Sequence, residues 1–565
     1  MRFARLRFLQ AAALAAAVLT SGILGAAGTT TAAAADVNLA LKKTYKVQAL
    51  VPDPYFDKLE WNYPDVENEL TDGEYGAPQY DHMAWQAFFR QGGRDVVLDL
   101  GQERTVHRIV SSWLHQKAAG VLYPRQVTYA VSTDGRNWAA VGTVKTKVSL
   151  TVMGPETQKF ELGGLDVVAR YVKLSSLTDI IEMVDEFEVW GEEAVAPTSQ
   201  RLAGSPPPTK ESAGYLKPGA PEAGGAHHIP LLYTGYFKDP AITTWTKQDY
   251  RPYVVYVDEN DKARDWMFDT VLIPAQGSTT SGRSFVVAPP KAQPANAADW
   301  LEFADWLFKP GFQLDALNQA VADAKVERKD PGRKVKVILD ILYTNPYQTD
   351  FGDVNGDGKS ENLDASAGVE EQLANRTAVT KWFLELLTKR WQEAKLDNLE
   401  LIGFWWHRES VPYEVSDTEE RAIRMATDVI RQAGYKSFWI PYAHAQGFLD
   451  WKQVGFDASL VQPNYMFADV DKVRLKSVAE IAAQTGQGLE MEERMTGQEL
   501  EEQKWLDYLN AGVRYGYMKN ALIAYYQNVK DFRYAAYAKD ARKRQLYYDY
   551  VYEFVKGIYT ERDLF

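Results

Sequence analysis

Two different spacings of apolar residues divide the chain into two parts. Before residue 192, apolar and polar residues alternate over short stretches such as Asp95–Leu100, Arg125–Val131 and Glu186–Trp190, and turn sequences such as Thr133–Asn137 separate them. Alternation with a period of two is typical of strands with one buried face. Because many short strands at regular spacing are the pattern of a sandwich, we predict an all-β jelly-roll sandwich for residues 36–191.

From residue 229 onward, apolar strands alternate with helical patterns. Helical periodicity is clear at Leu314–Lys325, Ala367–Ala394 and Thr418–Ala433. The pattern predicts a (β/α)8 TIM-like barrel over residues 229–565, with a doubly wound open sheet as the alternative. The eight candidate strands are Ile229–Tyr236, Asp269–Ala275, Lys334–Tyr343, Leu399–His407, Ser437–Ala443, Ala458–Tyr465, Gly488–Glu492 and Tyr515–Tyr525.

Two segments follow neither pattern. Residues 192–228 are rich in Pro, Gly, Ala and Ser and lack apolar periodicity, so we predict a partly extended linker. Residues 1–35 have three arginines among the first seven positions, continue with an apolar run and end in alanines, which is the pattern of a signal peptide. Its cleavage predicts a secreted, extracellular protein, and an uncleaved membrane anchor is the alternative. No other stretch reaches the ~20 apolar residues that span a bilayer.

Composition narrows the classes of function. A formal net charge of -13 disfavours nucleic acid as the main partner, because an acidic chain repels phosphate backbones. The absence of cysteine excludes disulfides, thiol nucleophiles and thiolate metal sites, and in a secreted protein it fits a bacterial source. Aromatic residues make up 13% of the chain, which fits sugar-binding surfaces and aromatic-rich cores equally.

The first part carries an ordered set of motifs: Asn38–Leu41, Glu69–Gly73, Trp85, Ser132–Trp138 and Asp185–Gly191. In this order they resemble the factor five/eight type C, or discoidin, family. The resemblance implies a jelly-roll-like sandwich, which in many bacterial members binds carbohydrate through loops at one end. The binding loops of the family vary too much for any sugar contact to be carried over to this sequence. Each residue that could face a sugar is more often a packing or surface residue: His82, Arg90, Arg94, Trp113 and His115.

The same resemblance implies a structural calcium ion, with Asp72 and Glu186 at the matching positions. Calcium binds hard oxygen ligands, namely carboxylates together with several carbonyls. The alternative is that Asp72 only shapes a turn and that Glu186 is a solvated strand residue.

The strongest chemical signal in the second part is the segment Leu401–Glu409, an apolar strand that ends in charged residues. As the fourth barrel strand it would place Glu409 at the carboxyl end, where the active sites of such barrels lie. Side chains alternate along a strand, so Trp405, His407 and Glu409 share one face. That face combines an aromatic wall, a basic group and a carboxyl group.

A second signal is the segment Gly488–Arg494, the seventh strand in this count. Glu490 and Glu492 have the same parity and would both point inward, and buried carboxylates are costly unless they are paired or functional. Carboxyls at the ends of strands four and seven are the arrangement of the large clan of retaining glycosidases. We predict Glu409 as acid/base and Glu492 as nucleophile, with Glu490 as the next candidate. The alternative is that residues 490–494 begin a solvated helix.

Other predicted strand ends carry polar and aromatic residues, which is the pattern expected of a sugar cleft. Asp340 is a third carboxylate candidate, because it lies inside an apolar strand. The candidate substrate-binding residues are Tyr233, Tyr236, Asp340, Trp405, His407, Tyr442, His444, Asn464, Tyr465 and Tyr526.

Residues 353–364 space oxygen donors as an EF-hand calcium loop does, with Gly358 at the sharp turn. The loop resembles the dockerin version but departs from it at Ser360, and the chain has no second copy. It predicts a lone calcium-stabilised loop, and an Asx-rich turn without metal is the alternative. The candidate ligands are Asp353, Asn355, Asp357, Lys359 and Asp364.

As a whole, residues 229–560 resemble a bacterial family known only as domain of unknown function 4855. The resemblance rests on Tyr233–Tyr236, Gly403–Glu409 and the strand at 488–492. That name supplies no reaction. The prediction of a secreted glycoside hydrolase, whose sandwich binds polysaccharide or oligosaccharide, therefore rests on the site argument and on fold analogy. The alternative is a non-catalytic glycan-binding or adhesion protein; no G-x-S-x-G or H-E-x-x-H motif supports an esterase or a lyase.

Overall fold

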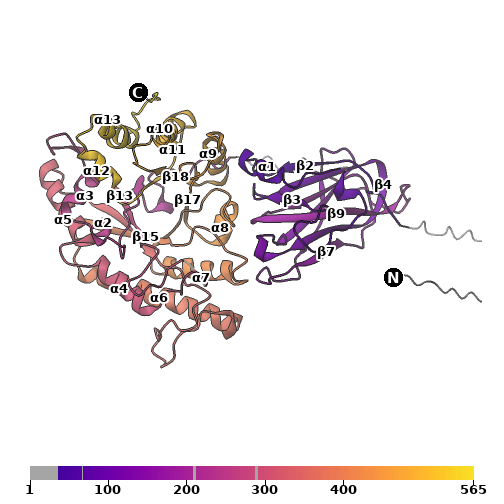
Figure 1. Ribbon diagram of the computed structural model, residues 1–565, viewed down its shortest axis with the longest axis horizontal. Coiled ribbons are helices and arrows are strands. Elements are labelled where there is room, and N and C mark those ends of the chain that lie inside the picture. Colours follow the sequence, from indigo (N-terminus) through magenta and orange to yellow (C-terminus); the bar gives the residue numbers. More distant parts are fainter. Residues whose placement is uncertain (1–35, 67, 208–211, 287–289, 565) are drawn as a thin grey trace, which may run out of the picture.

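Nine strands between Val37 and Glu192 build the N-terminal domain (Figure 1). The computed structural model describes residues 36–66, 68–207, 212–286 and 290–564. The long strand β4 (Arg94–His115) pairs antiparallel with four others, and its apolar face forms the core with Trp113 fully buried. The other elements are β1 (Val37–Asn38), β2 (Tyr45–Ala49), α1 (Pro54–Glu60), β3 (Gln86–Phe89), β5 (Gln126–Ser132), β6 (Ala139–Lys145), β7 (Glu156–Leu162), β8 (Val167–Ser176) and β9 (Ile181–Glu192). The predicted all-β fold is confirmed.

Eight parallel strands form the second domain, and they close into a barrel. The first and second strands meet through parallel bridges at Leu231 with Leu272 and at Thr234 with Ala275, which rules out the open sheet. In chain order the strands are β10 (His228–Pro230), β13 (Thr270–Ile273), β14 (Val335–Ile341), β15 (Leu399–Trp406), β16 (Lys436–Trp439), β17 (Ala458–Val461), β18 (Gly488–Glu493) and β19 (Ile523–Gln527). The predicted (β/α)8 class is therefore confirmed, and β15 and β18 are strands four and seven.

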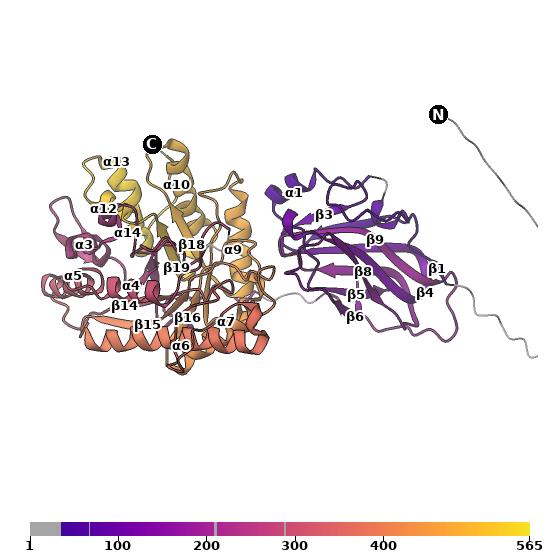
Figure 2. The same cartoon turned by 60° about the horizontal axis from the view of Figure 1, so that its bottom comes forward.

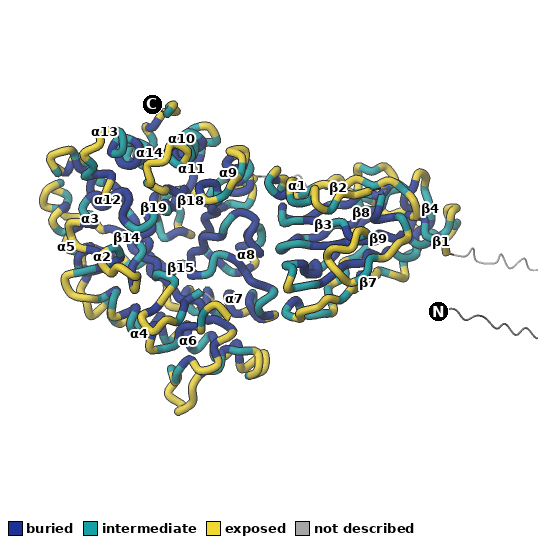
Figure 3. The backbone as a smooth tube through the Cα atoms, viewed as in Figure 1, coloured by how far each residue is buried: buried dark blue, intermediate teal, exposed yellow. Residues whose placement is uncertain are grey.

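Helices surround the barrel, and Figure 2 shows the long α6 running across its lower side. The last predicted strand, Tyr515–Tyr525, was placed too early, because Gly516 turns the chain and Tyr517–Asn520 form the short helix α11. The longer helices are α3 (Lys247–Val254), α4 (Ala297–Leu307), α5 (Gln313–Arg328), α6 (Val369–Glu393), α7 (Glu419–Gln432), α9 (Val473–Thr485) and α10 (Glu499–Arg514). Figure 3 shows the central strands of both domains as buried. Among the described residues, no helix is long and apolar enough to cross a membrane.

The predicted linker is in contact with both domains over its described residues. Trp138 and Ser205 exchange backbone hydrogen bonds of 2.7 and 3.0 Å on the sandwich. On the barrel, the amide of Leu216 donates to Gln487 (3.1 Å) and its carbonyl accepts from Leu522 (2.7 Å). The predicted signal peptide lies outside the described residues.

Candidate active site

A cavity of about 440 Å³ lies at the carboxyl end of the barrel strands. Five of the sequence-predicted residues line it: Tyr233 after β10, Trp405 on β15, His407 and Glu409 just after β15, and Tyr442 after β16. Because neighbouring strands of a barrel end at the same rim, residues far apart in the chain share this cavity. It is the candidate active site.

Glu409 is partly exposed on the cavity wall. Burial raises the pKa of its carboxyl above the usual range, while a hydrogen bond with Gln462 and the nearby His407 and Arg408 partly offset this. Gln462 follows β17, the sixth strand. A carboxyl group with a raised pKa that faces a cavity is suited to donate a proton at neutral pH.

Two more carboxyls come from β18. Glu492 accepts hydrogen bonds from the Tyr508 hydroxyl on α10 and from the backbone amide of Tyr465 (3.0 Å). Burial still raises its pKa to about 7. Glu490 is 3% exposed, and one of its oxygens has no hydrogen-bond partner among the described residues. Burial, followed by the charges of Glu492 and Glu409, raises the pKa of Glu490 well above 4.5.

The three carboxyls influence one another electrostatically, since Glu409 raises the pKa of both Glu490 and Glu492. Three such groups in one low-dielectric region do not all ionise together, so they share protons as a coupled set. The structure thus brings together the residues that the sequence analysis selected on strands four and seven.

Asp340 lies beneath the cavity and is fully buried. Its Oδ2 lies 2.6 Å from Nδ1 of His407 and accepts a hydrogen bond from the amide of Ala275 (2.8 Å). This geometry fixes the imidazole ring of His407, which stands against the Trp405 indole at 5.3 Å between centroids. Asp340 therefore orients a cavity residue and does not itself line the cavity.

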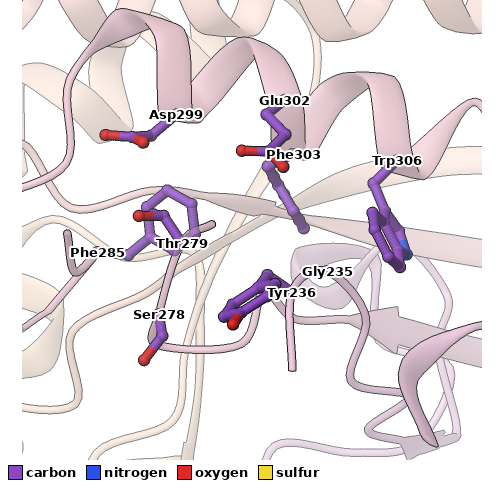
Figure 4. A pocket seen from close by; sticks show the side chains of 9 residues that line it. All are labelled: Gly235, Tyr236, Ser278, Thr279, Phe285, Asp299, Glu302, Phe303 and Trp306. Carbon is purple, nitrogen blue, oxygen red and sulfur yellow. The ribbon is translucent and has the colours of Figure 1, made fainter. Parts of the chain in front are cut away.

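Tyr236 lies in a second, smaller pocket (Figure 4), and residues of the segment 277–286 line both pockets. There it faces Phe303 and Trp306 of α4, with Glu302 and Asp299 on the same helix. The structure therefore does not place Tyr236 with the other candidates.

Four further candidates occupy other positions near the rim. The ring of Tyr526 packs edge-on against Tyr233 at 6.0 Å. Tyr465 directs its hydroxyl to Asp507 and supports Glu492 only through its backbone amide. Asn464 adopts a left-handed backbone conformation with φ 56°. His444 is 2% exposed and faces the sandwich instead of the cavity, where Asp53 and Phe56 surround it.

In the sandwich, most of the sugar-contact candidates are structural. Trp113 and His115 are fully buried, and Arg94 is buried in an ion pair with Glu60. His82 is different, because it lines an open pocket of about 220 Å³ with Tyr63 and Trp85. Exposed Met83 and the chain at Asn62 complete that pocket.

The two predicted calcium sites differ in how their oxygens are used. Glu186 accepts from the amide of Gly73 (2.6 Å) and lies beside Asp72. Its second oxygen and Oδ1 of Asp185 are buried and have no hydrogen-bond partner among the described residues. Burial raises the pKa of Glu186 to about 8 and that of Asp185 to about 6. Orphaned buried oxygens of this kind fit a hard cation completed by backbone carbonyls.

In the loop at 353–364 the carboxylates already accept backbone hydrogen bonds. Asp353 accepts from Gly356 (2.7 Å) and Gly358 (2.9 Å), and Asp357 accepts from Lys359 (2.8 Å). Asn355 and Asp364 likewise accept hydrogen bonds from backbone amides, those of Asp357 and Ser366. This is the geometry of an Asx-rich turn. Across the described ranges, no group of three or more His, Asp or Glu side chains is placed to hold a metal ion.

Two residues of the site were missed by the sequence analysis as candidates. Tyr508 lies in the middle of the amphipathic helix α10, where a buried tyrosine reads as core. Gln462 lies directly after β17 and was not among the candidates. Their contacts with Glu492 and Glu409 arise from packing between elements distant in sequence, for which neither position carries a local signal.

Comparisons with known proteins and family models show which family the chain belongs to. No curated protein matches the chain. Chitosan-binding module 1 from a chitosanase/glucanase of Paenibacillus sp. IK-5 is 22% identical, over 27% of this chain and 98% of that chain, with a TM-score of 0.19. A GH29 fucosidase of Ruminococcus gnavus is 15% identical over 28% of this chain and 27% of that one, with a TM-score of 0.19.

Two family models match the sequence. The F5/8 type C domain model matches residues 57–187, which confirms the discoidin resemblance of the sandwich. The model described as domain of unknown function (DUF4855) matches residues 228–552, more than half of the chain and the whole barrel sheet. The protein therefore belongs to the DUF4855 family.

Proposed function

We propose that the protein is a secreted glycoside hydrolase that cleaves a polysaccharide or oligosaccharide. One observation carries this proposal: Glu409, which lines the cavity after strand four, interacts electrostatically with the buried Glu490 and Glu492 of strand seven, at the barrel end where such enzymes act. Sandwich and barrel folds alone would not support a reaction, because both host many functions.

Hydrogen bonds and burial support one division of roles among Glu409, Glu490 and Glu492. Glu492 accepts two hydrogen bonds, which favour its ionised form, so it is the nucleophile. Glu409 borders the cavity, and burial keeps its proton on at higher pH than usual, so it is the acid/base. Burial and the charges of Glu492 and Glu409 favour the protonated form of Glu490. In this scheme Glu490 is therefore neutral, which limits the total negative charge of the three carboxyls.

In the proposed reaction the carboxylate of Glu492 attacks the anomeric carbon, while Glu409 gives its proton to the leaving glycosidic oxygen. The product is a covalent glycosyl ester on Glu492 and a released alcohol. Glu409 then takes a proton from water, which attacks the same carbon and releases the sugar with retained configuration. This route requires the two carboxyls to be about 5–5.5 Å apart in the complex.

The aromatic residues of the cavity would hold the sugar. The Trp405 indole and the Tyr233 and Tyr442 rings line it together with polar groups. Such a wall suits the apolar face of a pyranose, and the neighbouring carboxyl and imidazole groups suit its hydroxyls. In the sandwich we place a second carbohydrate contact in the pocket of Tyr63, His82 and Trp85.

We also propose one structural calcium ion in the sandwich, held by Asp72 and Glu186 with backbone carbonyls. The buried oxygens of Glu186 and Asp185 that have no partner in the described part of the chain support it. Calcium at residues 353–364 has weaker support, because those carboxylates already accept amide hydrogen bonds. Export through the predicted signal peptide completes the proposal.

The test is release of oligosaccharides from a panel of bacterial and fungal polysaccharides. Wild type should release them, and Glu409→Gln and Glu492→Gln should lower the rate at least about 100-fold, which is the scale of acid/base and nucleophile losses. Glu371→Gln, an exposed glutamate on α6, is the matched control. The proposal is contradicted if Glu409→Gln keeps full activity, or if wild type releases oligosaccharides from none of the polysaccharides.

A further inference from the structure

The sandwich meets the barrel beside the candidate active site. Helix α1 and the turn at 90–93 of the sandwich contact the barrel turn at 442–449, which follows β16, and helix α9. In Figure 1 the two domains lie side by side, with α1 and β3 on the sandwich side and α8 and α9 on the barrel side. A second pair supports the contact, since the guanidinium of Arg125 stacks on the Tyr413 ring at 4.0 Å.

A buried charged cluster joins the domains at Asp53. Its carboxylate caps α1 by accepting from Tyr55 (3.0 Å), and it also accepts from Nε2 of His444 (3.1 Å). The guanidinium of Arg474 on α9 lies 2.5 Å from the same carboxylate. All three side chains are at most 5% exposed. Buried charges whose partners come from the other domain hold the two together, because separation would leave them unpaired.

Arg90 makes the second link. Its guanidinium donates to the backbone carbonyl of His444 (2.8 Å) and lies over the Tyr442 ring at 5.6 Å. Tyr442 is one of the residues that line the active-site cavity. A sandwich side chain therefore touches a residue of the cavity wall.

Both turns at this contact have unusual backbones. Arg90 and Gln91 have φ of 42° and 57°, and His444 has φ of 63°. Such left-handed conformations cost roughly 1–2 kcal/mol for residues other than glycine, and surrounding contacts must hold them. Gln91 is fully buried and accepts from the amide of Asp53 (2.7 Å), so the sandwich turn and the α1 cap support each other.

The barrel turn leads directly to the acid/base candidate. Tyr442 pairs with Gln462 in a short parallel bridge, and the amide of Ala443 donates to the Gln462 carbonyl (2.7 Å). The Gln462 side chain in turn hydrogen-bonds Glu409. One continuous set of contacts therefore runs from Arg90 of the sandwich to Glu409 of the barrel.

We propose that the sandwich is a structural part of the cavity. Through Arg90 and Asp53 it holds the turn Tyr442–His444 in its strained conformation, and thereby positions Tyr442 and Gln462 beside Glu409. That the sandwich holds the turn follows from the contacts alone. The consequence for catalysis rests on the proposed function. Arg90 and Asp53 are positioning residues in this scheme.

The experiment measures hydrogen–deuterium exchange in the full chain, for wild type, Arg90→Ala and Asp53→Asn. Asparagine also caps helices, so Asp53→Asn keeps α1 while removing the charge that faces Arg474. We expect exchange at residues 441–449 to rise about tenfold or more in both variants, because the turn then opens locally. Arg201→Ala is the control, since Arg201 of the linker forms an exposed ion pair with Glu103 of the sandwich. Unchanged exchange at 441–449 in both variants overturns the proposal.

A second arm uses the shortest soluble oligosaccharide that wild type cleaves. A displaced Tyr442 and Gln462 should lower kcat about tenfold in Arg90→Ala at unchanged overall melting temperature, whereas Arg201→Ala should keep wild-type kcat. A wild-type kcat in Arg90→Ala with a loosened turn overturns the catalytic consequence. If wild type cleaves no glycan, the proposed function fails, and the exchange arm still decides whether the sandwich holds the turn.

Discussion

The hydroxyl of Tyr508 donates a hydrogen bond to the carboxylate of Glu492, joining helix α10 of the outer layer to strand β18 of the barrel. Burial raises the pKa of Glu492, and this bond is the largest of the contacts that lower it. The balance leaves the pKa at about 7, which sets the pH at which a nucleophile at this position becomes active.

Tyr508→Phe should move that pH upward. A hydrogen bond to a charged group contributes about 1.5–3 kcal/mol, which corresponds to roughly one to two pKa units. Because the nucleophile must be ionised, the acid limb of the kcat/KM profile should shift to higher pH by that amount. The measurement is a pH–rate profile. Tyr465→Phe is the control, as its hydroxyl contacts Asp507 while its amide still donates to Glu492. An unshifted limb in Tyr508→Phe contradicts the assignment.

Glu493→Gln should stabilise the protein at neutral pH. Glu493 does not line the cavity, is fully buried, and neither of its oxygens has a partner among the described residues. Burial, with Asp531 and Glu501 nearby, raises its pKa well above 4.5. A carboxyl whose folded-state pKa is raised binds its proton more tightly when folded, so stability falls as pH rises above about 4.5.

The amide does not titrate, so the gain of Glu493→Gln should be near zero at pH 4 and grow to about 1–3 kcal/mol at pH 8. Chemical denaturation at several pH values measures it. Glu490→Gln keeps the neutral state that the proposed scheme gives Glu490, and it should show the same pH trend. A gain in Glu493→Gln that does not depend on pH would show that the carboxyl is not the cause.

Calcium should stabilise the sandwich through Glu186. Without a cation, the raised pKa of Glu186, about 8, means that its ionisation near neutral pH opposes folding. Chelation should therefore lower the melting temperature of wild type, more at pH 8 than at pH 5. Glu186→Gln should remove the response to calcium. A matched Asp353→Asn variant that abolishes the response, with Glu186→Gln leaving it intact, would place the ion in the loop at 353–364.

Asp340→Asn should impair catalysis through His407. Oδ2 of Asp340 receives both the His407 ring nitrogen and the Ala275 amide. Asparagine can keep one oxygen at this place, but it loses the negative charge that strengthens both contacts. We expect kcat to fall about tenfold to 100-fold, with the melting temperature also lowered. Asp269→Asn tests a similar pair with His227 at the opposite end of the barrel, and should leave kcat unchanged. Equal losses in both variants would indicate a general effect on folding.

The fold was predictable because its signal is local. The β15 segment was placed within one residue of its observed end, and strands four and seven were numbered correctly, since apolar runs and period-two alternation survive in any context. Glu409 and Glu492 followed from that numbering. Tyr515–Tyr525 was misplaced because the aromatic residues around a short helix have the same apolar content as a strand.

The partners of the site residues were not predictable. His444 sits at a strand end like Tyr442, yet it faces Asp53, which is 391 positions away in the chain. Trp113 has the kind of aromatic ring on which sugars stack, but it is a fully buried core residue. Such outcomes depend on how two domains or two layers pack, and a single sequence carries no local mark of that packing.

The hydrogen bonds of Leu216 with Gln487 and Leu522 bear on where the chain can be divided. The amide of Leu216 satisfies the carbonyl just before strand seven, and its own carbonyl satisfies the amide just before strand eight. A recombinant barrel that starts at residue 229, where the strand pattern begins, would leave two buried backbone groups without partners at the base of the strands. A barrel fragment that keeps these two hydrogen bonds must therefore begin before Leu216, inside the segment that composition alone predicts to be a linker.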